Sequence, residues 1–81
     1  MEVILYSKEN CCLCEEAKVI LQELAGEYEL QIREIDIYKN DQLLEKYQIM
    51  IPVVEIAGEE IEAGIIHKDV IRKCLLGLLN S

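Results

Sequence analysis

Hydrophobic residues occur along the first half of the chain as short runs and as helical periods. An apolar run at residues 3–6, bounded by the polar residues 7–10, predicts a central strand buried on both faces. Apolar residues then recur at helical spacing, which predicts a helix over about residues 11–25 with Gly26 as its C-terminal stop. The β-branched residues within 30–37 favour a second strand.

The second half of the chain predicts a short helix, a hairpin and a final helix. Asn40 or Asp41 can cap a helix that continues to about Tyr47. Two apolar runs, residues 52–56 and 60–63, flank an Ala-Gly turn and predict an antiparallel hairpin. The chain closes on an amphipathic helical pattern. The order β-α-β-α-β-β-α predicts an α/β fold with a four-stranded mixed sheet and helices on both faces.

Length and charge narrow the classes of protein that remain. With 81 residues and 52% apolar content, and without linker or repeat, the chain is expected to form one domain over residues 1–81. A net charge of −8 argues against nucleic acid or an anionic membrane as partner and favours a basic protein. The sequence has no pattern typical of a signal peptide or membrane span, so we expect a cytoplasmic protein. We also expect a monomer.

The most informative residues are the cysteines at the predicted start of the first helix. In a reducing compartment, four cysteines favour catalysis or metal binding over structural disulfides. Residues three apart share a helix face, so Cys11 can reach Cys14 whereas Cys12 cannot. A thiol in the first turn faces unpaired N–H groups and the positive end of the helix dipole, which favour the thiolate. We therefore predict that Cys11 is the nucleophile and that Cys14 resolves a mixed disulfide.

These features together resemble a known family. The element order, the motif Lys8-x-x-Cys11-x-x-Cys14 and the lone Ile51-Pro52 before the third strand are similar to the glutaredoxin group of the thioredoxin superfamily, and above all to small glutaredoxin-like bacterial domains. The resemblance covers nearly the whole chain. It implies a thioredoxin-like, glutaredoxin-type fold and a thiol-disulfide oxidoreductase that requires no cofactor. Protein disulfides or glutathione mixed disulfides would be its substrates, and glutathione or a thioredoxin-reductase-type protein its electron donor.

The resemblance also implies roles for three residues outside the cysteine pair. Lys8 matches a cation that helps to stabilise the thiolate and binds a glutathione carboxylate. Pro52 matches a cis proline against the cysteine pair, although the sequence alone favours the commoner trans bond. Ile51 would then present its backbone N–H and C=O to an extended substrate, in the manner of strand addition.

Two departures from the glutaredoxin pattern bear on specificity. Cys12 stands where glutaredoxins commonly have proline, and it is either a partly exposed thiol at a tolerant position or a third redox or metal-binding thiol. Residues 62–67 lack the Asp with which glutaredoxins hold the γ-glutamyl end of glutathione. Together with Glu9, Glu15 and Glu16, this predicts weaker binding of anionic glutathione.

Other ionisable and sulfur-bearing residues have ordinary structural explanations. We expect Cys74 to act as a small core hydrophobe, His67 to be solvated near the start of the last helix, and Asp36 to be a strand-end or turn carboxylate.

Two alternative functions remain open. The first is a small metal-binding protein for Cu(I), zinc or an iron-sulfur cluster, although small copper chaperones end on a strand and this chain ends on a helical pattern. The second is a non-catalytic interaction module of thioredoxin-like fold. No residue is assigned here as a metal ligand.

Overall fold

A computed structural model describes residues 1–79 and has the predicted order of elements. The strands and helices are β1 (Glu2–Ser7), α1 (Cys12–Glu27), β2 (Gln31–Asp36), α2 (Asp41–Tyr47), β3 (Val53–Ile56), β4 (Glu59–Ala63) and α3 (Lys68–Leu79). A 3₁₀ turn, η1 (Ile37–Lys39), follows β2. The predicted α/β class is confirmed.

The four strands form one mixed sheet in the order β2-β1-β3-β4. β1 runs parallel to β2 and antiparallel to β3, and β3 pairs with β4 in an antiparallel hairpin. β1 is therefore an inner strand, as its continuous apolar run predicts. Val3 and Leu5 on one face are fully buried, and Tyr6 on the other face is also buried.

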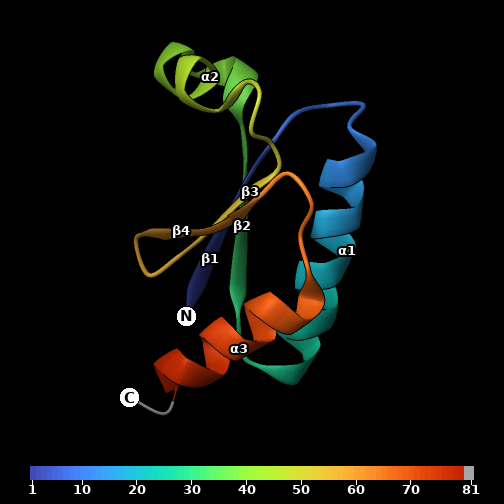
Figure 1. The fold of residues 1–81 in the computed structure, drawn as a ribbon, viewed down its shortest axis with the longest axis vertical. Coiled ribbons are helices and arrows are strands. Elements are labelled where there is room, and N and C mark those ends of the chain that lie inside the picture. The colour runs from blue at the N-terminus through green and yellow to red at the C-terminus, as the bar shows by residue number, and fades with distance from the viewer. Residues whose placement is uncertain (80–81) are drawn as a thin grey trace.

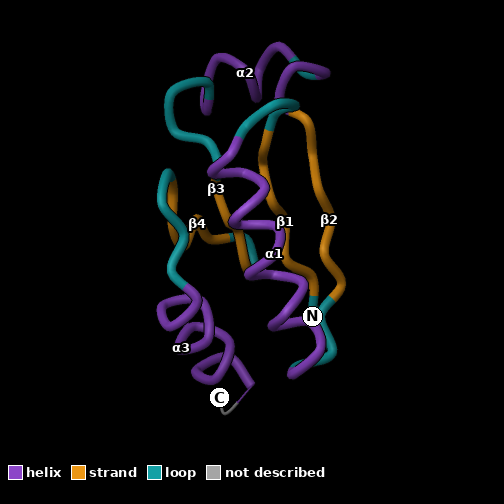
Figure 2. Tube along the Cα trace, turned by 90° about the vertical axis from the view of Figure 1, so that its right-hand side faces the viewer, coloured by secondary structure: helices purple, strands orange, loops and turns teal. Residues whose placement is uncertain are grey.

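Helices cover both faces of the sheet, as predicted. α1 and α3 lie together over one face, where the larger core is built on Val3, Leu5, Val54 and Ile56 (Figures 1 and 2). α2 lies near the end of the sheet where β1 ends, and it packs against the opposite face around Tyr6. The end of β1 is thus where the two layers and the connections after β1, β2 and β4 and before β3 come together.

Local sequence signals explain the short elements. The Asn40 side chain caps α2, because its Oδ1 accepts hydrogen bonds from the backbone N–H of Gln42 at 3.0 Å and of Leu43 at 3.2 Å. Between β3 and β4, Ala57 and Gly58 both have positive φ, 53° and 81°. Two successive positive φ values are what a two-residue hairpin turn of type I′ requires, so the predicted turn is confirmed.

The first helix differs from its prediction at both ends. Cys11 lies just outside α1, as its N-cap, and the helix passes through Gly26 to Glu27. Gly26 does not stop the helix, because the buried Leu24 holds the last turn against the core and the Tyr28 N–H still donates to the Leu24 carbonyl at 2.8 Å. Tertiary packing therefore outweighs the low helix propensity of glycine. Within residues 1–79, no helix combines the length and apolarity needed to cross a bilayer.

Stacking of Tyr6 in β1 on Tyr47 in α2 packs α2 against the sheet. The rings of Tyr6 and Tyr47 stack with their centroids 4.6 Å apart. The Tyr6 hydroxyl donates to Oε2 of Glu55 at 3.0 Å, and the Tyr47 hydroxyl donates to Oε1 of Glu60 at 3.1 Å. Burial, followed by the hydrogen bond to Glu55, raises the pKa of Tyr6 to about 12. A tyrosinate formed here would lose its solvation and face a carboxylate.

This network predicts how the fold responds to alkali. Because folding raises the pKa of Tyr6 from 10.0 to about 12, the stability it contributes is complete below pH 10 and is lost as the pH rises through 12. In a Tyr6→Phe variant, tyrosinate absorbance should lack the step near pH 12 that the wild type shows. Denaturant unfolding at neutral pH should show a loss of about 1 kcal/mol, the usual worth of one hydrogen bond. A wild-type titration that is complete near pH 10 would contradict this description of Tyr6.

Candidate redox site

The loop after β1 delivers Cys11 to the N-terminus of α1. Asn10 has a φ of 55°, a left-handed conformation that asparagine tolerates better than most residues. The chain therefore turns sharply at Asn10, and Cys11 follows in an extended conformation with φ −117° and ψ 109°. This is the usual backbone geometry of an N-cap, so Cys11 occupies the position where a side chain meets the unpaired N–H groups of the first turn.

The sulfur atoms of Cys11 and Cys14 form a disulfide across the first turn of α1, with the two Cα atoms 5.1 Å apart. The backbone N–H of Cys14 also donates to Sγ of Cys11 at 3.2 Å. Cys11 thus takes the place of the serine or aspartate oxygen at an ordinary N-cap. An N–H directed at this sulfur stabilises negative charge on it, as does the helix dipole.

The two cysteines differ in access to solvent. Cys11 is half-buried, whereas only 4% of Cys14 is exposed. Cys11 is thus the more accessible cysteine of the two, because the protein covers Cys14. This difference in exposure agrees with the assignment of Cys11 as nucleophile and Cys14 as resolving thiol, and those roles stay predictions.

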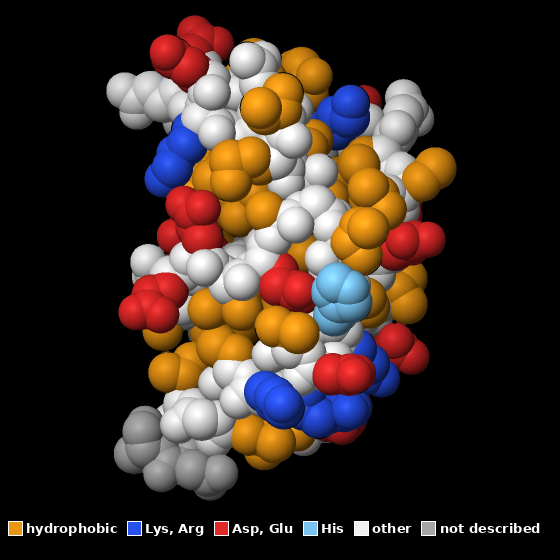
Figure 3. All heavy atoms as spheres, viewed as in Figure 1, with side chains coloured by type: hydrophobic (Ala, Val, Ile, Leu, Met, Phe, Trp, Pro, Cys, Tyr) orange, Lys and Arg blue, Asp and Glu red, His pale blue; other side chains and the backbone are white. Residues whose placement is uncertain are grey.

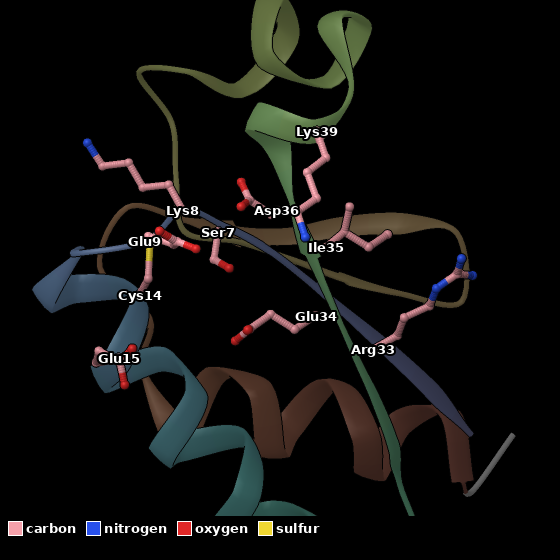
Figure 4. Close-up of a pocket in the computed structure, with 10 residues that line it drawn as sticks. All are labelled: Ser7, Lys8, Glu9, Cys14, Glu15, Arg33, Glu34, Ile35, Asp36 and Lys39. Atoms are coloured by element: carbon pink, nitrogen blue, oxygen red, sulfur yellow. The ribbon is translucent and has the colours of Figure 1, made fainter.

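A cleft of about 480 Å³ lies between the start of α1 and β2, and Cys14 lines it (Figure 4). Four carboxylates from three segments line the same cleft: Glu9, Glu15, Glu34 and Asp36. Figure 4 shows the Glu34 side chain reaching from β2 toward α1, where it pairs with Lys18 at 3.7 Å. Lys8, Arg33 and Lys39 line the cleft as well, so the covered side of the redox pair carries charges of both signs.

The structure places Pro52 at the same end of the sheet as the cysteines. The Ile51-Pro52 bond is cis, which confirms the expectation drawn from the family resemblance. The trans bond that the sequence alone favours is not the one observed. Pro52 comes just before β3, whose first residue Val53 pairs with Tyr6 near the end of β1. The Ile51 N–H donates to the Tyr47 carbonyl at 3.2 Å as α2 unwinds. Only the Ile51 carbonyl is then left to bind a substrate strand, and the substrate-binding roles of Ile51 and Pro52 stay predictions.

Lys8 and Cys12 are both exposed near the pair. Lys8 lines the cleft beside Cys14, but Figure 4 shows its side chain extending away from the cleft. Its proposed contact with a glutathione carboxylate stays a prediction. Cys12 is the first residue of α1 and a free thiol. Among residues 1–79, no three His, Cys, Asp or Glu side chains are grouped so that they could hold a metal ion.

Residues interpreted as structural do have structural contacts. The Asp36 carboxylate accepts a hydrogen bond from the Tyr38 N–H at 2.9 Å and caps η1, which makes it a turn carboxylate. Cys74 packs against the main core from α3. His67 is exposed, but it is paired through Nδ1 with Oε2 of Glu62 at 2.8 Å. Solvation is therefore an incomplete description of His67.

Three residues near the site were not predicted from the sequence. Ser7 is buried and lines the cleft, Glu34 faces the covered side of the pair, and Ile65 projects from the loop between β4 and α3. The two consecutive isoleucines after Gly64 were a usable signal for the last of these.

A thioredoxin-like sheet that carries a Cys-x-x-Cys disulfide at the start of its first helix defines a class of protein: the thioredoxin fold with a dithiol site. Comparison with known families is more specific. Residues 2–76 match the family described as Glutaredoxin-like domain (DUF836), and the chain belongs to that family.

Solved structures with the same fold support this placement. A structural-genomics target protein from X. campestris is 25% identical, covers 93% of this chain and 96% of its own, and has a TM-score of 0.77. A protein from Nitrosomonas europaea is 27% identical over 90% of this chain and 88% of its own, with a TM-score of 0.79. Thioredoxin 1 from Thermosipho africanus, at 19% identity over the whole of both chains and a TM-score of 0.66, shares the fold.

The two free cysteines should react differently with an alkylating agent. Burial, with a smaller effect of Glu59, raises the pKa of Cys74, so less of its reactive thiolate is present at neutral pH. When the Cys11–Cys14 pair is oxidised, iodoacetamide should modify Cys12 faster than Cys74, because Cys12 is exposed whereas Cys74 is partly buried and its pKa is raised by that burial. Peptide mass spectrometry over time measures both rates, and denaturant should make them equal. Equal rates in the folded protein would contradict the burial of Cys74.

Proposed function

We propose that this protein is a thiol-disulfide oxidoreductase that reduces disulfides of other proteins through Cys11 and Cys14. The observation that carries the proposal is the asymmetry of the pair. Cys11 caps α1 and receives an N–H at its sulfur, and it is accessible, whereas Cys14 is covered and within bonding reach of Cys11. An activated outer thiol and a protected inner thiol are what a two-step exchange requires.

The proposed reaction uses no cofactor. The Cys11 thiolate attacks one sulfur of a substrate disulfide, forms a mixed disulfide and releases the other substrate sulfur as a thiolate. Cys14 loses its proton and attacks Sγ of Cys11, which breaks the mixed disulfide and releases the second substrate sulfur. The substrate gains two electrons, and the pair ends as the disulfide seen here. Two electrons from glutathione or from a thioredoxin-reductase-type protein would restore the dithiol.

Charge near the pair supports protein disulfides over glutathione as substrates. Glu9, Glu15 and Glu16 surround the first turn of α1, and the whole chain carries a net charge of −8. A glutathione mixed disulfide is anionic and is repelled by this surface, while a protein disulfide beside lysine or arginine is attracted. Lys8 is exposed on the same loop and offsets part of this repulsion.

The first test of the proposal assigns the two thiols. Cys11→Ser should abolish disulfide reduction, whereas Cys14→Ser should accumulate a mixed disulfide on Cys11, because the covered thiol is needed only for release. Mass spectrometry of tryptic peptides after incubation with a protein disulfide identifies the trapped cysteine. Cys12→Ser serves as the control and should retain activity. A substrate trapped on Cys12, with Cys11 free, would overturn the assignment.

The second test concerns charge. Reduction of a glutathione mixed disulfide should be slow at low ionic strength and faster as salt shortens the Debye length from about 30 Å at 0.01 M to about 10 Å at 0.1 M. Replacing Glu15 and Glu16 with Gln should raise the low-salt rate by roughly two- to fivefold, the usual range for exposed charge interactions. Stopped-flow rates at several salt concentrations measure both effects.

Glu45→Gln/Glu29→Gln is a matched control for the second test, because both residues are exposed and lie outside the first turn of α1. It makes the same change in net charge and should leave the low-salt rate close to that of the wild type. A wild-type protein that reduces glutathione mixed disulfides quickly, without any dependence on salt, would contradict the proposed preference.

A further inference from the structure

Exposed apolar side chains gather on the loops around the redox pair. Figure 1 shows the loop before α3 rising to the segment before β3, to which it is hydrogen-bonded, while the loop before α1 passes above them. Each of them presents apolar residues to solvent: Leu13 at the start of α1, Ile49 and Met50 before Pro52, and Ile65 before α3. We call these four residues the apolar collar. Figure 3 shows hydrophobic side chains in several patches from the top to the bottom of this face, with charged side chains between them.

The loop that carries Ile65 is held in place at both ends. Glu62 accepts two hydrogen bonds from His67, one from its backbone N–H at 2.7 Å and one at the ring Nδ1 at 2.8 Å. Within the loop, the Gly64 N–H donates to the Pro52 carbonyl at 2.8 Å, and Gly64 has a φ of 82°. The loop is therefore attached directly to the segment that contains the cis proline.

Ile65 is exposed because its neighbours are anchored. Ile66, at 8% exposure, is buried in the main core, and Gly64 is bonded to Pro52, so Ile65 between them is 62% exposed. A side chain on a restrained loop loses little further entropy when a partner covers it. Exposed apolar groups that are held rigidly near a reactive sulfur are features of a binding surface.

Covalent chemistry at Cys11 determines what reaches this surface. A mixed disulfide holds the substrate sulfur about 2 Å from Sγ of Cys11, and an extended chain advances about 3.3 Å per residue. The residues next to the substrate cysteine must then lie over the loops beside Cys11. Leu13 lies between the two cysteines in sequence, and Ile65 is one residue from the Gly64–Pro52 bond.

We propose, on the basis of the function proposed above, that Leu13 and Ile65 are specificity-determining residues that select protein disulfides whose cysteine is flanked by a large apolar residue. Glu62 and His67 act as positioning residues, because they hold the Ile65 loop. The acidic side chains Glu15 and Glu16 favour lysine or arginine further along the same segment. The preferred substrate is an extended segment with an apolar residue beside its cysteine and basic residues beyond.

The test uses short peptides whose cysteine is activated as a mixed disulfide with thionitrobenzoate. The Cys11 thiolate attacks the peptide sulfur, the new disulfide joins protein and peptide, and coloured thionitrobenzoate leaves with the electron pair of the broken bond. A Cys12→Ser/Cys14→Ser background leaves Cys11 as the only thiol at the site. Two peptides that differ only by Leu or Ser beside the cysteine, both with lysines further out, report the preference as a ratio of second-order rate constants.

We expect the Leu peptide to react about fivefold faster than the Ser peptide, since partial burial of one apolar side chain is worth a factor of this order. Leu13→Ser and Ile65→Ser should each reduce the ratio to within about twofold, the range left when the apolar contact is lost. Leu76→Ser is a matched control, because Leu76 is 41% exposed on α3 and Leu13 is 42% exposed. It should keep the full ratio. Glu62→Gln should lower the ratio while Ile65 itself is unchanged.

The outcomes separate this inference from the function on which it rests. The uncharged hydroxyethyl disulfide should react with Cys11 equally in every variant, because it is too small to reach the collar. If Cys11 reacts with this reagent but the two peptides react at equal rates, the apolar preference is wrong and the proposed function stands. The same holds if the ratio survives both Leu13→Ser and Ile65→Ser. If Cys11 reacts with neither reagent, the proposed function itself fails.

Discussion

The burial of β1 is the constraint on which the rest of the molecule depends. Val3 and Leu5 are fully covered by the α1 and α3 layer, Tyr6 is covered from the α2 side, and both edges of the strand are paired. A strand in this position cannot move without disturbing both cores. Its carboxyl end is therefore a fixed point, and the four residues from Ser7 to Asn10 lead directly from it to Cys11. Rigid support of this kind is what a reactive group on a loop requires.

The difference between the two cysteines arises from one helix turn. The N-cap position gives Cys11 a backbone N–H partner and leaves it partly exposed, whereas Cys14, one turn later, is buried. Two chemically identical side chains thus acquire different environments without any additional charged partner. The acidic residues around the first turn act in the opposite direction on a thiolate, because they are like charges. Reactivity at Cys11 then depends on the balance between local N–H groups and a more distant acidic surface.

The loop between β4 and α3 is where this chain departs most from the glutaredoxin pattern. The Glu62 carboxylate is hydrogen-bonded to His67 at the other end of the same loop, so it links the two ends of the loop. The loop also exposes the apolar Ile65, which has no group that could bind the charged end of a small peptide. The cis Pro52 segment and this loop are joined by one backbone hydrogen bond, so that they form a single surface beside the pair. An apolar surface within an acidic surround favours a protein segment over a free anion.

Elements with a strong local cause were determined by the sequence itself. The apolar run of β1, the Asn40 cap and the Ala57-Gly58 turn each act over a few residues, and each appears in the structure where the pattern predicts it. The i, i+3 spacing of Cys11 and Cys14 is equally local, and it was sufficient to pair them and to set Cys12 aside.

Features that depend on distant contacts were decided only by the tertiary structure. Gly26 is a helix stop by propensity, yet packing of Leu24 against the core carries α1 past it. The cis bond at Pro52 and the Ile51 N–H engaged by Tyr47 depend on how β3 joins the sheet, which no local pattern encodes. The exposure of Ile65 rather than Ile66 was likewise decided by the packing of Ile66 into the main core. Local hydrogen bonds and spacing depend on neighbouring residues, whereas the burial of a side chain depends on the whole folded structure.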